Sequence, residues 1–188
     1  MKPFEGTKVY YAGSIRGADE SDKELPWKIV RYMADNGADV LSEHVAARTP
    51  EERESIRAKH VGQKILDAYK GQDPDVVIRK IDLDWVDQAD CVVALVNAPS
   101  LGVGMELEHA ILKPKLGLNE TPVLALVHKN FRNQLSAMVS GVTEEYFYLK
   151  IYENIEDIQK YIDEFMIKVR EEMNKMTNKR YEKEWKSR

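Results

Sequence analysis

The sequence predicts an α/β fold, in which a doubly wound, mainly parallel five-stranded sheet is flanked by helices as in Rossmann and flavodoxin-like domains. One observation behind this prediction is that short runs rich in β-branched residues alternate with longer segments of helical periodicity. The other is that every residue between Asp90 and Asn97 is apolar, which is typical of a parallel strand buried on both faces. Sheets of this kind bind ligands at the carboxyl ends of their strands.

Proline and glycine mark most of the expected helix boundaries. Pro26 fits only the first turn of the first helix, Thr49-Pro50 supplies an N-cap residue and an N1 proline for the second, and Gly71 with Pro74 ends that helix. The expected strands span residues 7–12, 38–41, 90–97, 122–128 and 146–151, the last at an edge of the sheet. The expected helices span about 22–36, 50–69, 75–88, 104–114 and 154–173, with a short helix or turn at 134–139.

The composition describes one domain and excludes several function classes. We expect a single domain over residues 1–174 and a charged C-terminal extension over 175–188, which is either a solvated continuation of the last helix or a frayed tail. The 32 acidic and 28 basic residues give a net charge of −4, which provides no general attraction to nucleic acid. Cys91 is the single cysteine and the four histidines lack the spacing of metal ligands, so neither a disulfide framework nor a metal is expected. No apolar leader follows Met1 and no stretch approaches the roughly 18 apolar residues of a membrane span, which indicates a cytoplasmic protein that does not bind membranes.

Glu106 follows the central strand and is the strongest candidate for chemistry. The segment from Pro99 to Gly104 is expected to be a glycine-containing loop, with a helix from about Gly104. Glu106 would then lie in the first helical turn, where the helix dipole favours the ionised carboxylate that a nucleophile or base needs. Acidic residues are also common in first turns simply as dipole partners, so the position alone does not establish a catalytic role.

Asp82 is the second candidate because of its place on the helix expected at 75–88. Ile78, Ile81 and Trp85 share the apolar face of that helix, and Asp82 lies at its edge. Partial burial there would raise the pKa of the carboxyl toward the range of a general acid. An aspartate at such a boundary is more commonly just solvated, and Asp82 alone is weak evidence.

The loop after the first strand, Gly13-Ser14-Ile15-Arg16-Gly17, contains two glycines, a hydroxyl and a guanidinium. This composition suits a phosphate bound by backbone N–H groups, with Arg16 as its charge partner. The loop matches neither the Walker motif nor the full dinucleotide-binding fingerprint, so its signal is weak when taken alone. Together with the segment 42–46, which contains His44, and the loop before Glu106, it would line one edge of the sheet.

Five segments taken together resemble the 2′-deoxynucleoside 5′-phosphate N-hydrolase family, whose members are relatives of the nucleoside 2-deoxyribosyltransferases. The segments, which occur in consistent order over about residues 7–150, are Tyr10 to Gly17, Leu41 to Ala46, Asp82 to Asp90, Pro99 to Leu107 and Leu135 to Gly141. The chain departs from the family in a longer stretch at 47–80, in Met105 where an aromatic residue is frequent, and in Glu108 where glycine is usual.

The resemblance implies a role for each matching residue. Glu106 would attack C1′ of a 2′-deoxynucleoside 5′-monophosphate to form a covalent glycosyl intermediate, Asp82 would protonate the departing base, and Tyr10 would orient Glu106 and crowd the position of a 2′-hydroxyl. The implied substrate-binding residues are Gly13, Ser14, Ile15, Arg16, Gly17, His44, Ser100, Gly102, Ser136, Ala137 and Met138. Ser136 would serve the neighbouring subunit's site in a homodimer, and no cofactor would be needed.

Three alternatives remain open at this point. A 2-deoxyribosyltransferase would use a second base instead of water to capture the intermediate, although Ser14, Arg16, Ser100 and Ser136 favour a phosphorylated substrate. A hydrolase of ribonucleotides, such as cytidine monophosphate, would differ only in how the site treats the 2′ substituent. A non-catalytic nucleotide sensor would have no need for Tyr10, Asp82 and Glu106 together.

Overall fold

The computed structural model describes residues 2–14, 24–56, 58 and 70–186, with side chains up to residue 175. In this part of the chain, five strands form one sheet in the order β2-β1-β3-β4-β5, and every neighbouring pair is parallel. The strands are β1 (Lys8–Gly13), β2 (Asp39–Val40), β3 (Cys91–Leu95), β4 (Val123–His128) and β5 (Phe147–Tyr152). The predicted five-stranded α/β sheet is confirmed, and it is wholly parallel.

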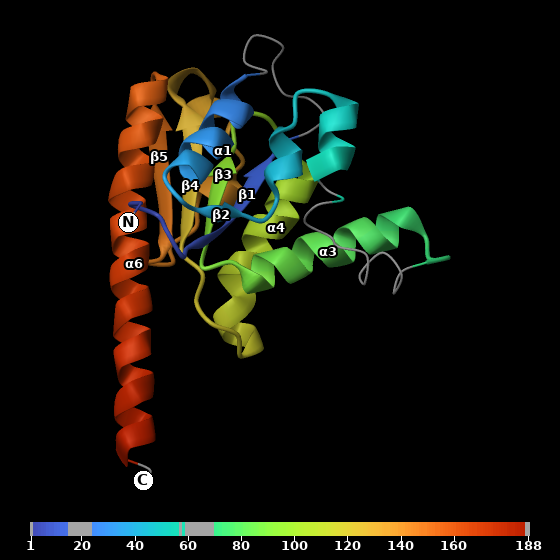
Figure 1. Ribbon diagram of the computed structural model, residues 1–188. Coiled ribbons are helices and arrows are strands. Elements are labelled where there is room, and N and C mark those ends of the chain that lie inside the picture. The colour runs from blue at the N-terminus through green and yellow to red at the C-terminus, as the bar shows by residue number, and fades with distance from the viewer. Residues whose placement is uncertain (1, 15–23, 57, 59–69, 187–188) are drawn as a thin grey trace.

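Helices cover both faces of the sheet (Figure 1). On one face α1 (Leu25–Asp35) and α6 (Ile155–Lys186) pack against β1, β4 and β5, and on the other face α3 (Pro74–Gln88) and α4 (Leu101–Leu112) pack against β1, β3 and β4. Successive side chains of a strand point to opposite faces, so Tyr11 lies beneath α1 and α6 whereas Tyr10 lies beneath α3 and α4. Both tyrosines are completely buried.

The start of α4 differs from the expected one, whereas the end of α6 matches one of two expected forms. α4 begins at Leu101, three residues earlier than predicted, because Ser100 adopts an extended conformation and its Oγ accepts a hydrogen bond from Val103 N as an N-cap. Gly102 and Gly104 are therefore helical residues and not loop residues. α6 continues beyond residue 173 to Lys186, so the charged extension takes the helical one of its two expected forms, and it leaves the body of the molecule near its C-terminal end (Figure 1). Residues 50–56 are helical, and most of the remaining helix predicted to residue 69 lies outside the described residues.

Shorter helices connect the strands at the edges of the sheet. They are η2 (Glu43–Ala46), η3 (Lys113–Leu116), η4 (Lys129–Gln134) and α5 (Ala137–Ser140). Within the described residues, no helix is both long and apolar enough to span a bilayer. No three His, Cys, Asp or Glu side chains of that same part of the chain gather as a metal site requires.

The strand order places the ligand-binding edge between β1 and β3. β1 lies between β2 and β3, and this β1/β3 boundary is the point where flavodoxin-like sheets open a crevice at the carboxyl ends of their strands. Gly13 at the end of β1 is in register with Leu95 at the end of β3. The loops that follow these two strands therefore leave the sheet side by side.

Candidate active site

Three predicted catalytic residues come together on the face of the sheet covered by α3 and α4. Tyr10 extends from β1, Asp82 from α3 and Glu106 from α4, although they are distant in sequence. The groups are close enough for Asp82 to raise the pKa of both Tyr10 and Glu106 through its charge. Asp82 is half-buried beside Ile81 and Trp85, as its position on the helix predicts.

Glu106 has the environment of a carboxyl group that titrates near neutral pH. Burial raises its pKa from 4.5 to about 7, a contact with the Tyr10 hydroxyl opposes this rise, and the charge of Asp82 adds to it. Because α4 begins at Leu101, Glu106 lies in the second turn and not in the first, where the helix dipole would act on it. The expectation of a carboxylate ionised by the helix N-terminus is therefore wrong, since burial dominates.

Tyr10 is a neutral hydrogen-bond donor placed beside the two carboxyl groups. Burial raises the pKa of its hydroxyl well above the usual value, and the charges of Glu106 and Asp82 raise it further. Among the described residues, no partner lies at standard hydrogen-bonding distance from the buried hydroxyl, so its contact with Glu106 is weak compared with the effect of burial. Tyr10 therefore stays protonated and can stabilise the charged form of Glu106.

His44 joins the site from η2, which follows β2. Its ring is buried and lies 5.4 Å from the ring of Trp85, at an interplanar angle of 56°. Trp85 is one turn from Asp82 on α3, so this contact brings the loop after β2 to the helix that carries Asp82. The structure thus places His44 in the predicted site.

The described parts of the two predicted phosphate-binding loops are Gly13 and Ser14 at the end of β1 and the first turn of α4 after β3. Gly13 accommodates the ring of Tyr11, because a Cβ at position 13 would lie 2.8 Å from that ring. The first turn of α4 contains Gly102, and such a turn presents backbone N–H groups that favour an anion. Ser14 is half-buried, while the predicted residues Ile15, Arg16 and Gly17 lie outside the described residues.

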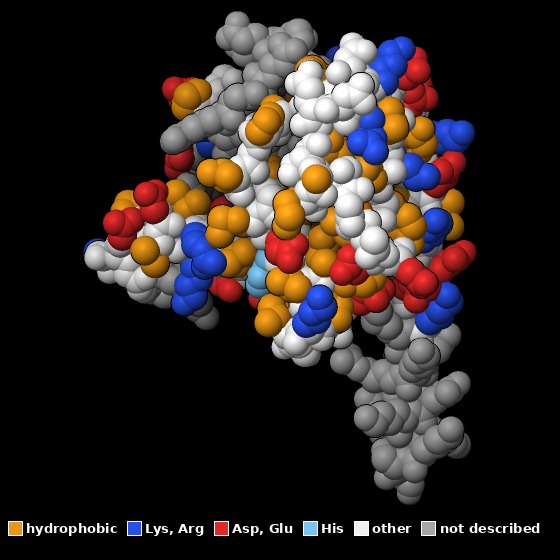
Figure 2. Space-filling model, turned by 180° about the vertical axis from the view of Figure 1, so that it is seen from behind, with side chains coloured by type: hydrophobic (Ala, Val, Ile, Leu, Met, Phe, Trp, Pro, Cys, Tyr) orange, Lys and Arg blue, Asp and Glu red, His pale blue; other side chains and the backbone are white. Residues whose placement is uncertain are grey.

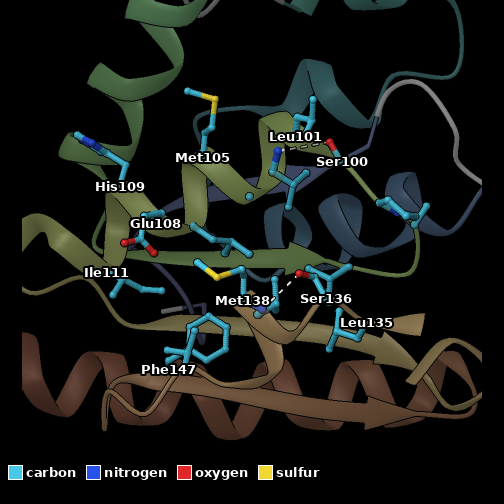
Figure 3. Close-up of a pocket in the computed structure, with 18 of the residues that line it drawn as sticks. Ser100, Leu101, Met105, Glu108, His109, Ile111, Leu135, Ser136, Met138 and Phe147 are labelled. Atoms are coloured by element: carbon cyan, nitrogen blue, oxygen red, sulfur yellow. Dashed lines mark hydrogen bonds between the residues drawn. The ribbon is translucent and has the colours of Figure 1, made fainter. Parts of the chain in front are cut away.

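Ser136, Ala137 and Met138 lie on the other side of α4, away from Glu106. Ser136 and Met138 border a groove of about 770 Å³, which is also lined by Ser100 and Leu101 and is shown in Figure 3. The lining does not include Tyr10, Asp82 or Glu106. Leu101 is 91% exposed and Met138 80% exposed. Figure 2, which views the molecule from behind, shows apolar side chains gathered over the middle of that face.

Sequence reasoning did not assign roles to two polar residues that shape this edge of the sheet. The Ser42 hydroxyl accepts a hydrogen bond from Tyr11 N and donates one to Tyr11 O, both at 2.7 Å, and so continues the pairing between β1 and the short β2. The Asn97 side chain accepts from His128 N at 2.7 Å and donates to the Tyr152 hydroxyl, which fixes the start of the loop that carries Ser100. A polar residue directly after a buried strand is the signal that could have identified both.

Comparisons with known proteins agree with the resemblance of the sequence. No protein-family model matches the chain. The chain is 31% identical over 159 residues to a Thermofilum pendens protein named "Putative 2'-deoxynucleoside 5'-phosphate N-hydrolase 1", covering 85% of this chain and 94% of that protein. It is 38% identical over 136 residues to the 5-hydroxymethyl-dUMP N-hydrolase of Rattus norvegicus, covering 72% of this chain and 70% of the rat protein.

A solved structure supports the fold independently. The CMP N-glycosidase of Clostridium botulinum superposes with a TM-score of 0.52 over 84% of this chain and 98% of its own, at 14% sequence identity. At that identity the similarity concerns the fold alone. The relatives with more than 30% identity, by contrast, align over most of both sequences. On this evidence, the chain belongs to the 2′-deoxynucleoside 5′-phosphate N-hydrolase family.

Proposed function

We propose that this protein hydrolyses the N-glycosidic bond of 2′-deoxynucleoside 5′-monophosphates, releasing the free base and 2-deoxyribose 5-phosphate. The observation that carries the proposal is the half-buried Glu106 carboxyl, with a pKa of about 7, beside Asp82 and the buried Tyr10 hydroxyl. β1 and β3 end in register at one edge of the sheet, and the composition of the loops that follow them suits a phosphate, which supports the proposal. The names of the relatives support a nucleotide as the substrate.

The chemistry requires opposite protonation states of the two carboxyl groups. The Glu106 carboxylate forms a bond to C1′ while the bond from C1′ to the base nitrogen breaks, and Asp82 donates a proton to the departing base. A water molecule then attacks C1′ and gives its proton to Asp82, which releases the sugar phosphate and restores the Glu106 carboxylate. Two neighbouring carboxyl groups resist simultaneous ionisation, so such a pair readily retains the one proton that this cycle needs.

Tyr10 and the predicted phosphate-binding loops would position Glu106 and the sugar of the substrate relative to each other. The hydroxyl of Tyr10 stabilises the charged form of Glu106, and the enclosed ring would leave little room for a 2′-hydroxyl on the sugar. Contacts to the 5′-phosphate would hold C1′ against Glu106, so that binding energy from a remote group lowers the barrier at the reacting carbon.

The test is to incubate the purified protein with deoxynucleoside monophosphates, ribonucleoside monophosphates and unphosphorylated deoxynucleosides, each with and without an acceptor base. We expect free base and 2-deoxyribose 5-phosphate from the deoxymonophosphates, identified by chromatography. Base exchange in the presence of acceptor would instead indicate a transferase, and release from ribonucleotides would indicate a ribonucleotide hydrolase. Nucleotide binding without any turnover would indicate a sensor and would refute the proposal.

Variants assign the two carboxyl groups. Glu106→Ala should abolish turnover and retain phosphate-dependent binding, and Asp82→Asn should slow base release by about 10² to 10⁴-fold, the usual contribution of a general acid. Asp84→Asn is the matched control for Asp82, because Asp84 lies on the same helix but is exposed. Unchanged turnover in Glu106→Ala would contradict the assigned nucleophile.

We also propose that the protein is a homodimer in which Ser136 reaches the neighbouring subunit's site. Its position across α4 from its own Glu106, next to the exposed Leu101 and Met138, supports this arrangement. Equal mixing of Glu106→Ala and Ser136→Ala subunits should restore about a quarter of wild-type sites, because half of the dimers are mixed and each mixed dimer has one intact site. No restoration on mixing would place Ser136 outside the neighbouring site.

A further inference from the structure

A buried lysine joins the C-terminal ends of α3 and α4. Lys113 follows the last residue of α4 and is 1% exposed. Its Nζ donates hydrogen bonds to the backbone oxygens of Val86 and Asp87, each at 2.9 Å. These carbonyls belong to the last turn of α3, where no further helical turn supplies donors for them and where the helix dipole favours a cation.

An ion pair makes a second link between the same two helices. His109 Nε2 of α4 lies 2.8 Å from Oδ1 of Asp87, with both side chains partly exposed. His109 and Lys113 are four residues apart and so lie on one face of α4. Together with Asp87 and the carbonyl of Val86, they form what we call the α3–α4 latch.

The latch lies one helical turn C-terminal to each of the two candidate catalytic carboxyl groups. Glu106 is three residues before His109, and Asp82 is four residues before Val86, so in each helix the carboxyl group is one turn from a latch residue. The buried residues of α3 are Ile81, Trp85 and Val86, all in its second half, and the first half extends away from the sheet in Figure 1. The position of Asp82 therefore depends on how the C-terminal end of α3 is held.

We propose that Lys113 and His109 are positioning residues, which fix the C-terminal end of α3 on α4 and thereby set the distance between Asp82 and Glu106. This proposal depends on the proposed function for its catalytic consequence. Burying an ammonium group costs free energy. Burial accordingly lowers the pKa of Lys113, although the charges of Asp87 and Asp90 act in the opposite direction. An apolar side chain would fill the same volume, but it could not donate hydrogen bonds to the carbonyl groups of Val86 and Asp87 and so could not fix the end of α3.

The experiment uses Lys113→Met, which keeps the buried volume, and His109→Gln, which removes the ion pair at a more exposed position. Tyr146→Phe is the matched control, because the Tyr146 hydroxyl donates to Ile111 O at 2.8 Å and so holds the same end of α4 through a hydrogen bond that involves no residue of α3. Each variant is measured for kcat, KM and the titration of the Glu106 carboxyl by ¹³C NMR, assigned by comparison with Glu106→Gln.

If the latch positions Asp82, Lys113→Met and His109→Gln should each lower kcat about tenfold with little change in KM, as expected for misplaced reacting groups. They should also lower the pKa of Glu106 by about one, because Asp82 raises that pKa and α3 helps to bury the carboxyl. Tyr146→Phe should leave both quantities at the wild-type value.

A wild-type pKa of Glu106 in His109→Gln and in folded Lys113→Met would overturn the proposal, as would an equal effect of Tyr146→Phe. If Lys113→Met fails to fold, His109→Gln alone decides, because its side chain is 22% exposed and its removal leaves the buried lysine in place. The NMR titration needs no turnover. A protein that releases no base would therefore refute the proposed function while the latch remained testable.

Discussion

Replacing Glu106 by Gln should change how the stability of the protein depends on pH. The substitution keeps the size of the side chain and removes its ability to ionise. The folded state holds the Glu106 pKa at about 7, against 4.5 for an ordinary glutamate. A raised carboxyl pKa means that the folded protein favours the protonated form, so its contribution to stability is fully present below pH 4.5 and is lost as the pH rises to about 7.

The magnitude follows from the difference between the folded and unfolded pKa values of Glu106. A tenfold change in the proton affinity of a group corresponds to about 1.4 kcal/mol, so ionising Glu106 destabilises the wild-type fold by up to about 3 kcal/mol at pH 8. The glutamine variant has no such penalty. The difference in free energy of unfolding between Glu106→Gln and wild type should therefore change by about 3 kcal/mol in favour of the variant between pH 4 and pH 8.

Urea unfolding at half-unit pH steps between 4 and 8.5 measures this difference directly. Glu54→Gln is the control, because Glu54 is an exposed glutamate in the helical segment 50–56, and its stability difference should stay flat with pH. A flat difference for Glu106→Gln as well would show that Glu106 is not desolvated by the fold. In wild-type enzyme, kcat/KM should fall as the pH rises through about 7, because the pair of carboxyl groups then loses the one proton that the proposed cycle needs.

Further expectations concern Tyr10, Ser42 and the outer side of α4. Tyr10→Phe should slow turnover and move the fall of kcat/KM to higher pH, because the hydroxyl lowers the pKa of Glu106; a fall at lower pH would contradict this contact. Ser42→Ala should lower the free energy of unfolding by about 2 to 3 kcal/mol, measured in urea, because it leaves both Tyr11 N and Tyr11 O without their buried partner. Leu101→Glu combined with Met138→Glu should shift a dimer to monomers in sedimentation, and an unchanged mass would exclude the groove as the dimer contact.

The fold was predictable from sequence because its signals are local. Each strand is a short apolar run, and the helix boundaries carry prolines, glycines or cap residues that act within one or two turns. The start of α4 was missed because Ser100, Gly102 and Gly104 suit both a loop and a capped helix, and the choice depends on the Ser100 Oγ bond to Val103 N. The choice between a helical extension and a frayed tail after residue 173 stayed open in the sequence, because this charged segment lacks the apolar stripe that marks the rest of α6.

The proximity of Tyr10, Asp82 and Glu106 was predictable from the sequence, but their electrostatics was not. The segments that contain Tyr10, Asp82 and Glu106 could be recognised from their order along the chain, whereas the pKa of Glu106 depends on burial by elements far away in sequence. The latch formed by His109, Lys113 and Asp87 has no sequence signature, because it arises only where α3 crosses α4.

Because α4 begins at Leu101, its N-terminus and Glu106 lie in different electrostatic environments. At its N-terminus the free N–H groups and the helix dipole favour an anion, which suits a substrate phosphate. Glu106 lies five residues further on, about 7.5 Å along the axis, where burial keeps its pKa near neutrality. If Glu106 were in the first turn, its charge would compete with the phosphate for the same N–H groups. In the proposed function, the position of Glu106 one turn beyond the N-terminus would let α4 hold the phosphate end of a nucleotide while Glu106 attacks its sugar.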